Sequence, residues 1–252
     1  MDFTLKTYQS LLHALKRNGY KFQTFEEFLS NPLNGKSVVL RHDIDKLPQN
    51  AFQLAQLEHQ NGVQASYYIR VRKGVWDETI IKKIVSFGHE ISYHYEDLTI
   101  ARGNDEKALE HFKKQLAKIR EFYPAKTICM HGSPLSKWDN CKLWDKYDYR
   151  SMGIIGEPYL DVDYSKILYI TDTGRSWNSA KVSVRDKVKD GLKVSIKNTT
   201  HLISLLDGHQ LPDKIIMNTH PQRWFNFGFG WLREFVIQNI KNKVKRILIK
   251  LS

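Results

Sequence analysis

The chain has 252 residues, of which 41% are hydrophobic and 12% aromatic. This is enough apolar surface for a substantial core, in either one α/β barrel or two small domains. The sequence contains no run of about 18 apolar residues, which argues against a membrane-spanning helix. The start, MDFTLKTYQS, lacks the basic and then apolar pattern of a secretory signal. We therefore expect a cytoplasmic protein whose two cysteines, Cys129 and Cys141, are reduced thiols.

The net charge of +12 is unevenly distributed. Residues 231–252 contain six Lys or Arg side chains and one acid, Glu234. Such a balance predicts an anionic partner, for example a nucleotide-linked sugar, a pyrophosphate-linked lipid or a membrane surface, or else a basic surface that serves only solubility. The sequence contains no recognised nucleic-acid-binding motif, so we expect no nucleic-acid partner.

The first half of the chain alternates helix and strand patterns. Apolar residues at helical spacing predict helices, and short β-branched or aromatic runs between glycine stops predict strands. The predicted helices are 4–18, a short one that begins after a capping box at Thr24 and Glu27, 48–61, 77–87 and 104–122. The predicted strands are 37–45, 63–71, 89–96 and 126–132. This alternation over about 130 residues is typical of parallel β-α units.

The second half is less regular. The elements predicted there are a helix at 138–147, a strand at 167–171, a helix at 199–206 and a strand at 214–219. Residues 151–166 and 178–198 show no clear pattern. Because no Pro/Ser-rich linker divides the chain, we predict one domain over residues 1–252. It would consist of N-terminal helices in 1–36, a barrel in 37–224 and a basic amphipathic helix in 225–252.

Acidic residues or histidine follow most of the predicted strands. The strand 37–45 ends in Asp43 and Asp45, which alternation places on one face. An isolated Asp-x-Asp is more typical of a solvated turn than of a site. The other strand ends, however, supply similar side chains: His94 and Glu96, His131, Asp172, and His220. Because the carboxyl ends of barrel strands meet at one rim, we expect these residues to form a site.

Carboxylate and imidazole together suit a divalent cation such as Zn²⁺. A water molecule activated by the ion, next to a second carboxylate that accepts its proton, would make the site hydrolytic. His220 is the best placed residue to protonate a leaving group. The strand ends therefore predict metal-assisted hydrolysis, without naming the bond that is cleaved.

Four stretches together resemble the motifs of the polysaccharide deacetylase family, the NodB-type carbohydrate esterases. They are VVLRHDID at 38–45, GHEISYHYEDL at 88–98, TDTGRSW at 171–177 and IIMNTH at 215–220. The resemblance implies a distorted (β/α)7 barrel of the α/β class. It also implies removal of acetyl groups from N-acetylated sugars.

The positions of the matching motifs imply individual roles. Asp43 would be the catalytic base, and Asp45 and His94 would be metal ligands. His220 would be the general acid, with Asp172 orienting it.

Further residues near these motifs are candidate supporting or substrate contacts. Arg41 shares a face with Asp43 and would keep that carboxylate ionised, or would form a structural ion pair. Trp177 would form an apolar wall of the acetyl pocket, with Arg175 beside it. Tyr67 offers a ring that could stack on a sugar.

The chain departs from the family's motifs at two positions. Ile44 separates two aspartates that are adjacent in the family, so the assignment of base and ligand stays open. The second histidine of the family's H-[ST]-x-x-H would fall at Leu98. The third ligand is then either Glu96 or His131, and we prefer His131. A carbohydrate-binding pseudoenzyme that has lost the metal is the alternative to an enzyme.

The C-terminal residues predict an amphipathic helix over 232–251 with lysines on its polar face. Its apolar residues recur at steps of three or four: Ile237, Ile240, Val244, Ile247 and Leu251. This stripe would either dock on the barrel or lie on an anionic membrane surface.

Together these features predict a metal-dependent hydrolase that removes an N-acetyl group from a sugar. Zn²⁺ is the expected ion, with Co²⁺, Mn²⁺ or Ni²⁺ as alternatives. The sugar would be nucleotide- or lipid-linked, in the assembly of a surface polysaccharide such as O-antigen or capsule. The enzyme would be cytoplasmic or peripheral at the inner membrane face. Hydrolysis of another amide or a cyclic ureide is the alternative reaction.

Overall fold

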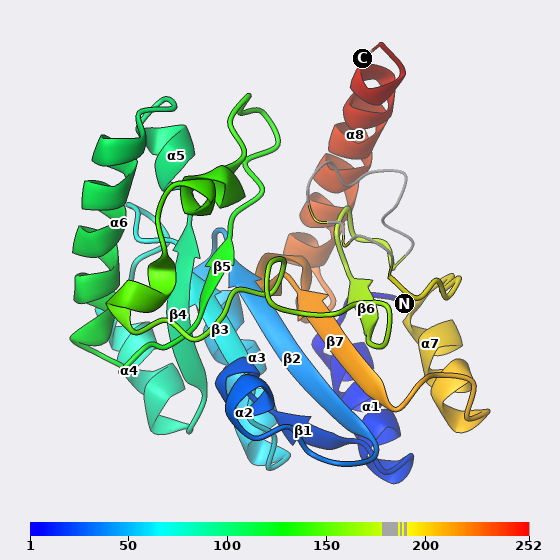
Figure 1. The fold of residues 1–252 in the computed structure, drawn as a ribbon. Coiled ribbons are helices and arrows are strands. Elements are labelled where there is room, and N and C mark those ends of the chain that lie inside the picture. Colours follow the sequence, from blue (N-terminus) through cyan, green and yellow to red (C-terminus); the bar gives the residue numbers. More distant parts are fainter. Residues whose placement is uncertain (178–185, 187, 189–190, 252) are drawn as a thin grey trace.

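The computed structural model describes residues 1–177, 186, 188 and 191–251 (Figure 1). Their strands form a seven-stranded parallel sheet in the order β5-β4-β3-β2-β7-β6, with β1 paired to the start of β2. The strands are β1 Lys21–Gln23, β2 Ser37–Ile44, β3 Ser66–Ile69, β4 Glu90–Tyr95, β5 Ile128–Met130, β6 Leu168–Thr171 and β7 Lys214–Thr219. The sheet curls into a half-barrel with helices outside it, which is the distorted (β/α)7 architecture expected from the sequence.

The helices follow the predicted alternation. They are α1 Leu5–Arg17, α2 Phe25–Ser30, α3 Pro48–Gln60, α4 Glu78–Ser86, α5 Asp97–Ile100, α6 Asp105–Arg120, α7 Thr199–Asp207 and α8 Phe229–Leu251. The capping box predicted for α2 is present, because Thr24 and Glu27 each accept the other's backbone N–H. Among the described residues, no helix is both long and apolar enough to cross a bilayer.

Several short elements differ from the prediction. The stretch 138–147 contains a 3₁₀ helix, Asn140–Asp145, rather than an α-helix. β1 and α5 were not predicted, because three or four residues are too short to show a period. Both still matter for the site, since β1 pairs with β2 and α5 follows the end of β4.

β2 is buried along its whole length, and its two faces pack against different groups. Val38 and Leu40 belong to the large core between the sheet and the outer helices. Val39 packs instead with Cys129 on the concave side. Alternation therefore turns the residues ending in Asp43 towards the inside of the curl, at the edge where the parallel strands end.

A buried carboxylate, Glu58 of α3, joins the convex face of β2 to the helices. Glu58 Oε1 lies 2.8 Å from His42 Nε2, and Glu58 accepts hydrogen bonds from Tyr67, at 2.6 Å, and from Tyr8. Burial raises the pKa of Glu58, but the charge and hydrogen bond of His42 outweigh burial and lower it. Because His42 precedes Asp43, this cluster holds the strand directly behind the site.

Replacing Glu58 with Ala should lower the free energy of unfolding by about 3–5 kcal/mol, because His42, Tyr8 and Tyr67 would stay buried without their acceptor. Urea denaturation followed by circular dichroism measures the change. Glu110→Ala, at an exposed position of α6, is the matched control and should cost less than about 0.5 kcal/mol. Equal effects of both substitutions would contradict a stabilising role for the cluster.

Candidate metal centre and catalytic site

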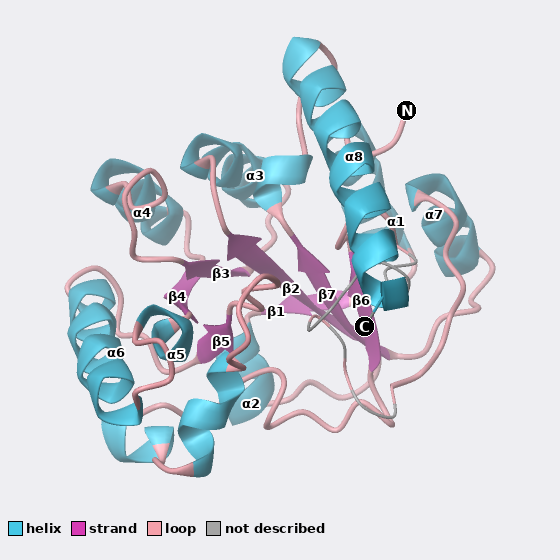
Figure 2. Cartoon of the chain, turned by 90° about the horizontal axis from the view of Figure 1, so that it is seen from above, coloured by secondary structure: helices cyan, strands magenta, loops and turns pink. Residues whose placement is uncertain are grey.

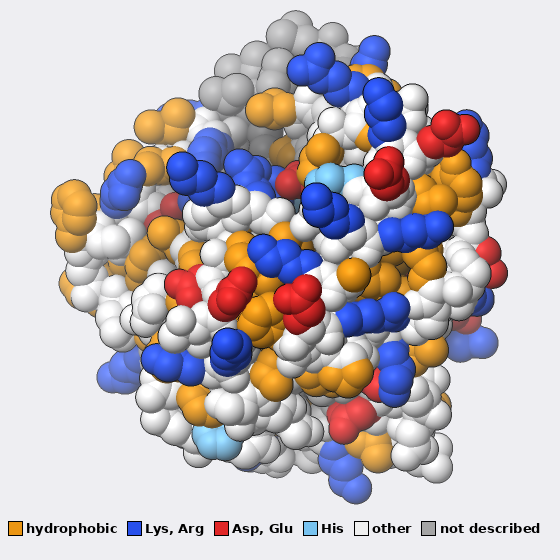
Figure 3. All heavy atoms as spheres, turned by 90° about the vertical axis from the view of Figure 1, so that its left-hand side faces the viewer, with side chains coloured by type: hydrophobic (Ala, Val, Ile, Leu, Met, Phe, Trp, Pro, Cys, Tyr) orange, Lys and Arg blue, Asp and Glu red, His pale blue; other side chains and the backbone are white. Residues whose placement is uncertain are grey.

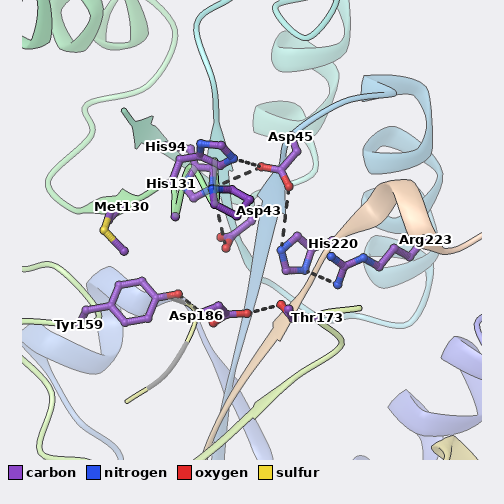
Figure 4. A pocket seen from close by; sticks show the side chains of 12 residues that line it. Asp43, Asp45, His94, Met130, His131, Tyr159, Thr173, Asp186, His220 and Arg223 are labelled. Atoms are coloured by element: carbon purple, nitrogen blue, oxygen red, sulfur yellow. Dashed lines mark hydrogen bonds and ion pairs between the residues drawn. The ribbon is translucent and has the colours of Figure 1, made fainter. Parts of the chain in front are cut away.

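The carboxyl ends of the strands enclose a small polar cavity of about 110 Å³ (Figure 4). Side chains on or directly after four strands line it, and they are Asp43, Asp45, His94, His131 and His220. Asp172, at the end of β6, lies behind His220 and contacts it. The structure thus brings together the side chains that were expected from five separate strand ends.

Asp45, His94 and His131 present three ligand atoms within 4.8 Å of one another. Asp45 Oδ1 is 3.5 Å from Nε2 of His94 and 3.5 Å from Nε2 of His131. Within the described part of the chain, no group donates a hydrogen bond to this buried oxygen. In a tetrahedral site, Zn²⁺ at about 2.1 Å from its ligands keeps them about 3.4 Å apart. The spacing and the unpartnered oxygen therefore suit a divalent ion.

Both imidazoles are oriented through their second ring nitrogen. His94 Nδ1 donates to the backbone carbonyl of Cys129 at 3.0 Å. His131 Nδ1 lies 3.0 Å from Glu96 Oε2 and donates to it. With the proton on Nδ1, each Nε2 lone pair is free to face Asp45, as in metal-binding histidines.

Glu96, the other expected third ligand, supports His131 from the Nδ1 side. Its oxygens also accept hydrogen bonds from Arg70 Nε at 3.0 Å and Nη2 at 2.6 Å. Burial raises the pKa of Glu96, but hydrogen bonds and charges from His131 and Arg70 outweigh burial and lower it to about 2. The residue where the family motif has its second histidine, Leu98, is buried in an apolar cluster.

Asp43 lies beside the three-ligand group, 3.9 Å from His94 Nε2. Its Oδ2 accepts hydrogen bonds from Arg41 at 3.1 Å and Asn218 at 3.0 Å. Asp43, His94 and Cys129 also lie close enough to hold an ion. Burial, however, raises the pKa of Cys129 well above its ordinary value, and a cysteine ligates metal as the thiolate. This environment suits Asp43 to a general base better than to a ligand.

His220 faces the other two histidines across the cavity (Figure 4). Its Nδ1 donates to Asp172 at 2.7 Å, and its Nε2 lies 4.0 Å from Asp45 Oδ2. Asp172 is fully buried, which raises its pKa, but the charges of Arg223 and His220 outweigh burial and lower it. The Asp172 carboxylate thus fixes the ring with Nε2 towards the cavity.

One wall of the cavity could not be predicted from the sequence. Asp186 lies in the stretch 178–198, which has no helical or strand pattern, and lines the cavity with Tyr159 and Thr173. It accepts hydrogen bonds from both hydroxyls, with Tyr159 Oη at 2.9 Å. Burial raises the pKa of Asp186, but the charge of Arg41 and its other partners lower it to about 2. Asp186 belongs to no recognisable motif or helical or strand repeat in the sequence, so it could not be identified as a site residue.

The structure corrects three expected substrate contacts, which lie away from the cavity. Trp177 packs in the apolar core and donates to Thr199 at 2.9 Å. Tyr67 lies on the convex face of the sheet and contacts Glu58. It pairs in register with His42, whose side chain points to the convex face, whereas the next residue pairs with Asp43 on the concave face. Arg175 donates to a backbone carbonyl of α8 at 3.1 Å.

No protein-family model and no curated protein matches the chain. Solved structures of family 4 carbohydrate esterases, the polysaccharide deacetylases, do match it. The peptidoglycan N-acetylglucosamine deacetylase Bc1960 gives a TM-score of 0.47 at 15% identity, covering 94% of this chain and 91% of that one. A family 4 esterase from Streptococcus mutans gives 0.46 at 15%, covering 90% and 86%.

A family 4 pseudoenzyme from Bacillus anthracis, BA3943, also matches, with a TM-score of 0.45 at 12% identity. The match covers 84% of this chain and 62% of that one. At these values the likeness extends to the outline of the fold and assigns no activity to this chain.

Replacing His131 with Ala should weaken Zn²⁺ binding by more than about 100-fold, because one of three ligands is lost, whereas Glu96→Gln should weaken it by only about tenfold. Competition with a chromogenic chelator measures both affinities. His13→Ala, at an exposed histidine of α1, is the control and should bind as the wild type does. A larger loss in Glu96→Gln than in His131→Ala would instead make Glu96 the ligand.

Proposed function

We propose that the protein is a metal-dependent hydrolase that removes an N-acetyl group from a sugar. The observation that carries this proposal is the group Asp45, His94 and His131, converging on one point beside Asp43. His220 lies across the same cavity and supplies an acid opposite the base. Ligands, base and acid together are what hydrolysis of an amide requires.

A divalent ion held by these ligands would polarise the acetamide carbonyl and acidify a water molecule. Asp43 accepts the proton of the attacking water, while Arg41 and Asn218 keep its carboxylate in place. His220 donates a proton from Nε2 to the nitrogen as the C–N bond breaks, and Asp172 holds its ring during the transfer. The products are acetate and a free amine on the sugar.

Zn²⁺ is the ion that we propose, because two imidazoles and one carboxylate form a common catalytic zinc set that leaves a coordination position open. Co²⁺, Mn²⁺ and Ni²⁺ accept the same ligand types. His131 takes the place of the histidine absent at Leu98, which favours a metal enzyme over a pseudoenzyme.

The proposed substrate is an N-acetylated sugar on a nucleotide or lipid carrier, used in the assembly of a surface polysaccharide such as O-antigen or capsule at the inner face of the membrane. A groove of about 520 Å³ adjoins the cavity and shares Asp45, His131 and Arg223 with it. Lys46 and Lys241 line the same groove. Its basic side chains would suit the phosphates of such a carrier.

Asp43→Asn should retain Zn²⁺ but lower kcat by about 10²–10⁴-fold, because only the proton acceptor is lost. Asp45→Asn should lose metal binding and hydrolysis together. Metal content of the purified variants and acetate release measure the two effects. Full activity in both Asp45→Asn and His94→Ala would refute the assignment of the ligands.

Acetate and free amine should form in equal amounts from N-acetylhexosamine substrates, and removal of the metal with a chelator should stop the reaction reversibly. Enzymatic assay of acetate and fluorescent labelling of the amine measure the products. Hydrolysis of a cyclic ureide without acetate release would favour the other amide reaction. A zinc-loaded protein that binds the sugars and hydrolyses neither class would be a pseudoenzyme.

A further inference from the structure

The inner face of α8 is polar. Glu234 and Gln238 are buried, with exposed fractions of 6% and 7%, and both turn towards the body of the protein. Glu234 pairs with Lys46 at 3.1 Å, and Asn242 donates to the Gly174 carbonyl at 2.7 Å. Glu234, Gln238 and Asn242 recur every four positions along α8 and so share one side of the helix. We call these three residues the polar ladder, and their contacts fix which side of the helix faces inward.

The outer face of α8 is apolar and uncovered. Phe229, Leu232, Val236 and Ile240 have exposed fractions of 83%, 53%, 48% and 58%. Steps of three and four residues place them on one stripe, opposite the polar ladder. A helix that packs on a protein core normally shows the reverse arrangement. Ile240, expected to dock on the barrel if the helix packed there, is instead 58% exposed.

Positive charge flanks this outer stripe. Arg233 and Lys243 are exposed, and helical spacing places Arg233 beside the stripe and Lys243 in line with it, three residues after Ile240. The one acid of α8, Glu234, faces inward and is paired. The outer face thus combines apolar side chains with uncompensated positive charge.

The position of α8 relates this face to the site. In both ribbon views α8 lies over the edge where the strands end (Figures 1 and 2). Gln238, Ile240 and Lys241 of α8 form a wall of the groove that adjoins the cavity, and Leu135, 94% exposed, lines the same groove. α8 therefore borders the groove that adjoins the cavity.

Basic residues on another face of the protein are arranged differently. The face that carries α4 and α6 shows Lys and Arg dispersed among acidic and apolar side chains (Figure 3). A dispersed pattern of both signs is typical of a solvated surface. The combination on α8 is thus not a general consequence of the protein's net charge.

We propose that the outer face of α8 is a docking surface for an anionic lipid bilayer. The helix lies in the plane of the interface, with Phe229, Leu232, Val236 and Ile240 in the acyl boundary and Arg233 and Lys243 at the phosphates. Its polar ladder holds it on the protein, beside the groove that adjoins the cavity. This inference does not depend on catalysis or on the metal.

Cosedimentation of the full chain with vesicles tests the proposal. The wild type should bind vesicles of phosphatidylcholine mixed with phosphatidylglycerol and bind vesicles of phosphatidylcholine alone at least about tenfold more weakly. Salt should weaken binding to the anionic vesicles. The variants Leu232→Gln with Ile240→Gln, and Arg233→Gln with Lys243→Gln, should each reduce binding by about tenfold or more.

Matched controls separate this surface from general charge and apolarity. Ile100→Gln with Leu160→Gln removes two comparably exposed apolar side chains elsewhere, and Lys113→Gln with Lys114→Gln removes two exposed lysines of α6. Both controls should bind as the wild type does. Circular dichroism of each variant checks that it is folded.

Two results would overturn the proposal. One is wild-type protein that fails to bind anionic vesicles, or whose binding falls as much in the controls as in the α8 variants. The other is a dimer, seen by sedimentation velocity without lipid, that Leu232→Gln with Ile240→Gln dissociates, because the stripe would then be covered by a second copy.

Discussion

The alternation of side chains along β2 is the constraint on which core and site both depend. One face of this strand sends His42 to the buried Glu58, and the other sends Arg41 and Asp43 into the curl. A shift of one residue would place the carboxylate in the apolar core and the histidine in the cavity. Hydrogen bonds on the convex side therefore fix the register that the concave side needs for its chemistry.

His131 completes the candidate metal group, and its orientation depends on a neighbouring carboxylate. Leu98 is packed in an apolar cluster, whereas His131 reaches Asp45 from the end of β5. That ring needs an acceptor at Nδ1, which Glu96 provides while a paired Arg70 holds it. Glu96 thus orients a candidate ligand that directly follows a strand.

Most of the fold and much of the candidate site could be predicted from the sequence, for a definite reason. Residues such as Asp43 and His220 lie at the ends of apolar strands. Because these strands are parallel, their carboxyl ends and the residues on them meet at one edge of the sheet. Asp186 could not be found, because the sequence around it shows no helical or strand pattern and only side-chain hydrogen bonds relate it to the cavity. Trp177 was misplaced because a motif specifies position along the chain, whereas packing against the core decides where the ring points.

The C-terminal helix shows the same limit at the surface. Helical spacing reveals that α8 has an apolar stripe, but it does not say whether that stripe faces protein or lipid. The contacts of Glu234 and Asn242 show that the polar side of the helix faces the body, because each polar partner there would lose its bond if the helix rotated. If the helix were rotated so that the stripe packed on the barrel, less apolar surface would be exposed to water. The observed orientation therefore loses hydrophobic burial and gains polar contacts. That exchange is reasonable where a second apolar phase, the bilayer, covers the stripe instead.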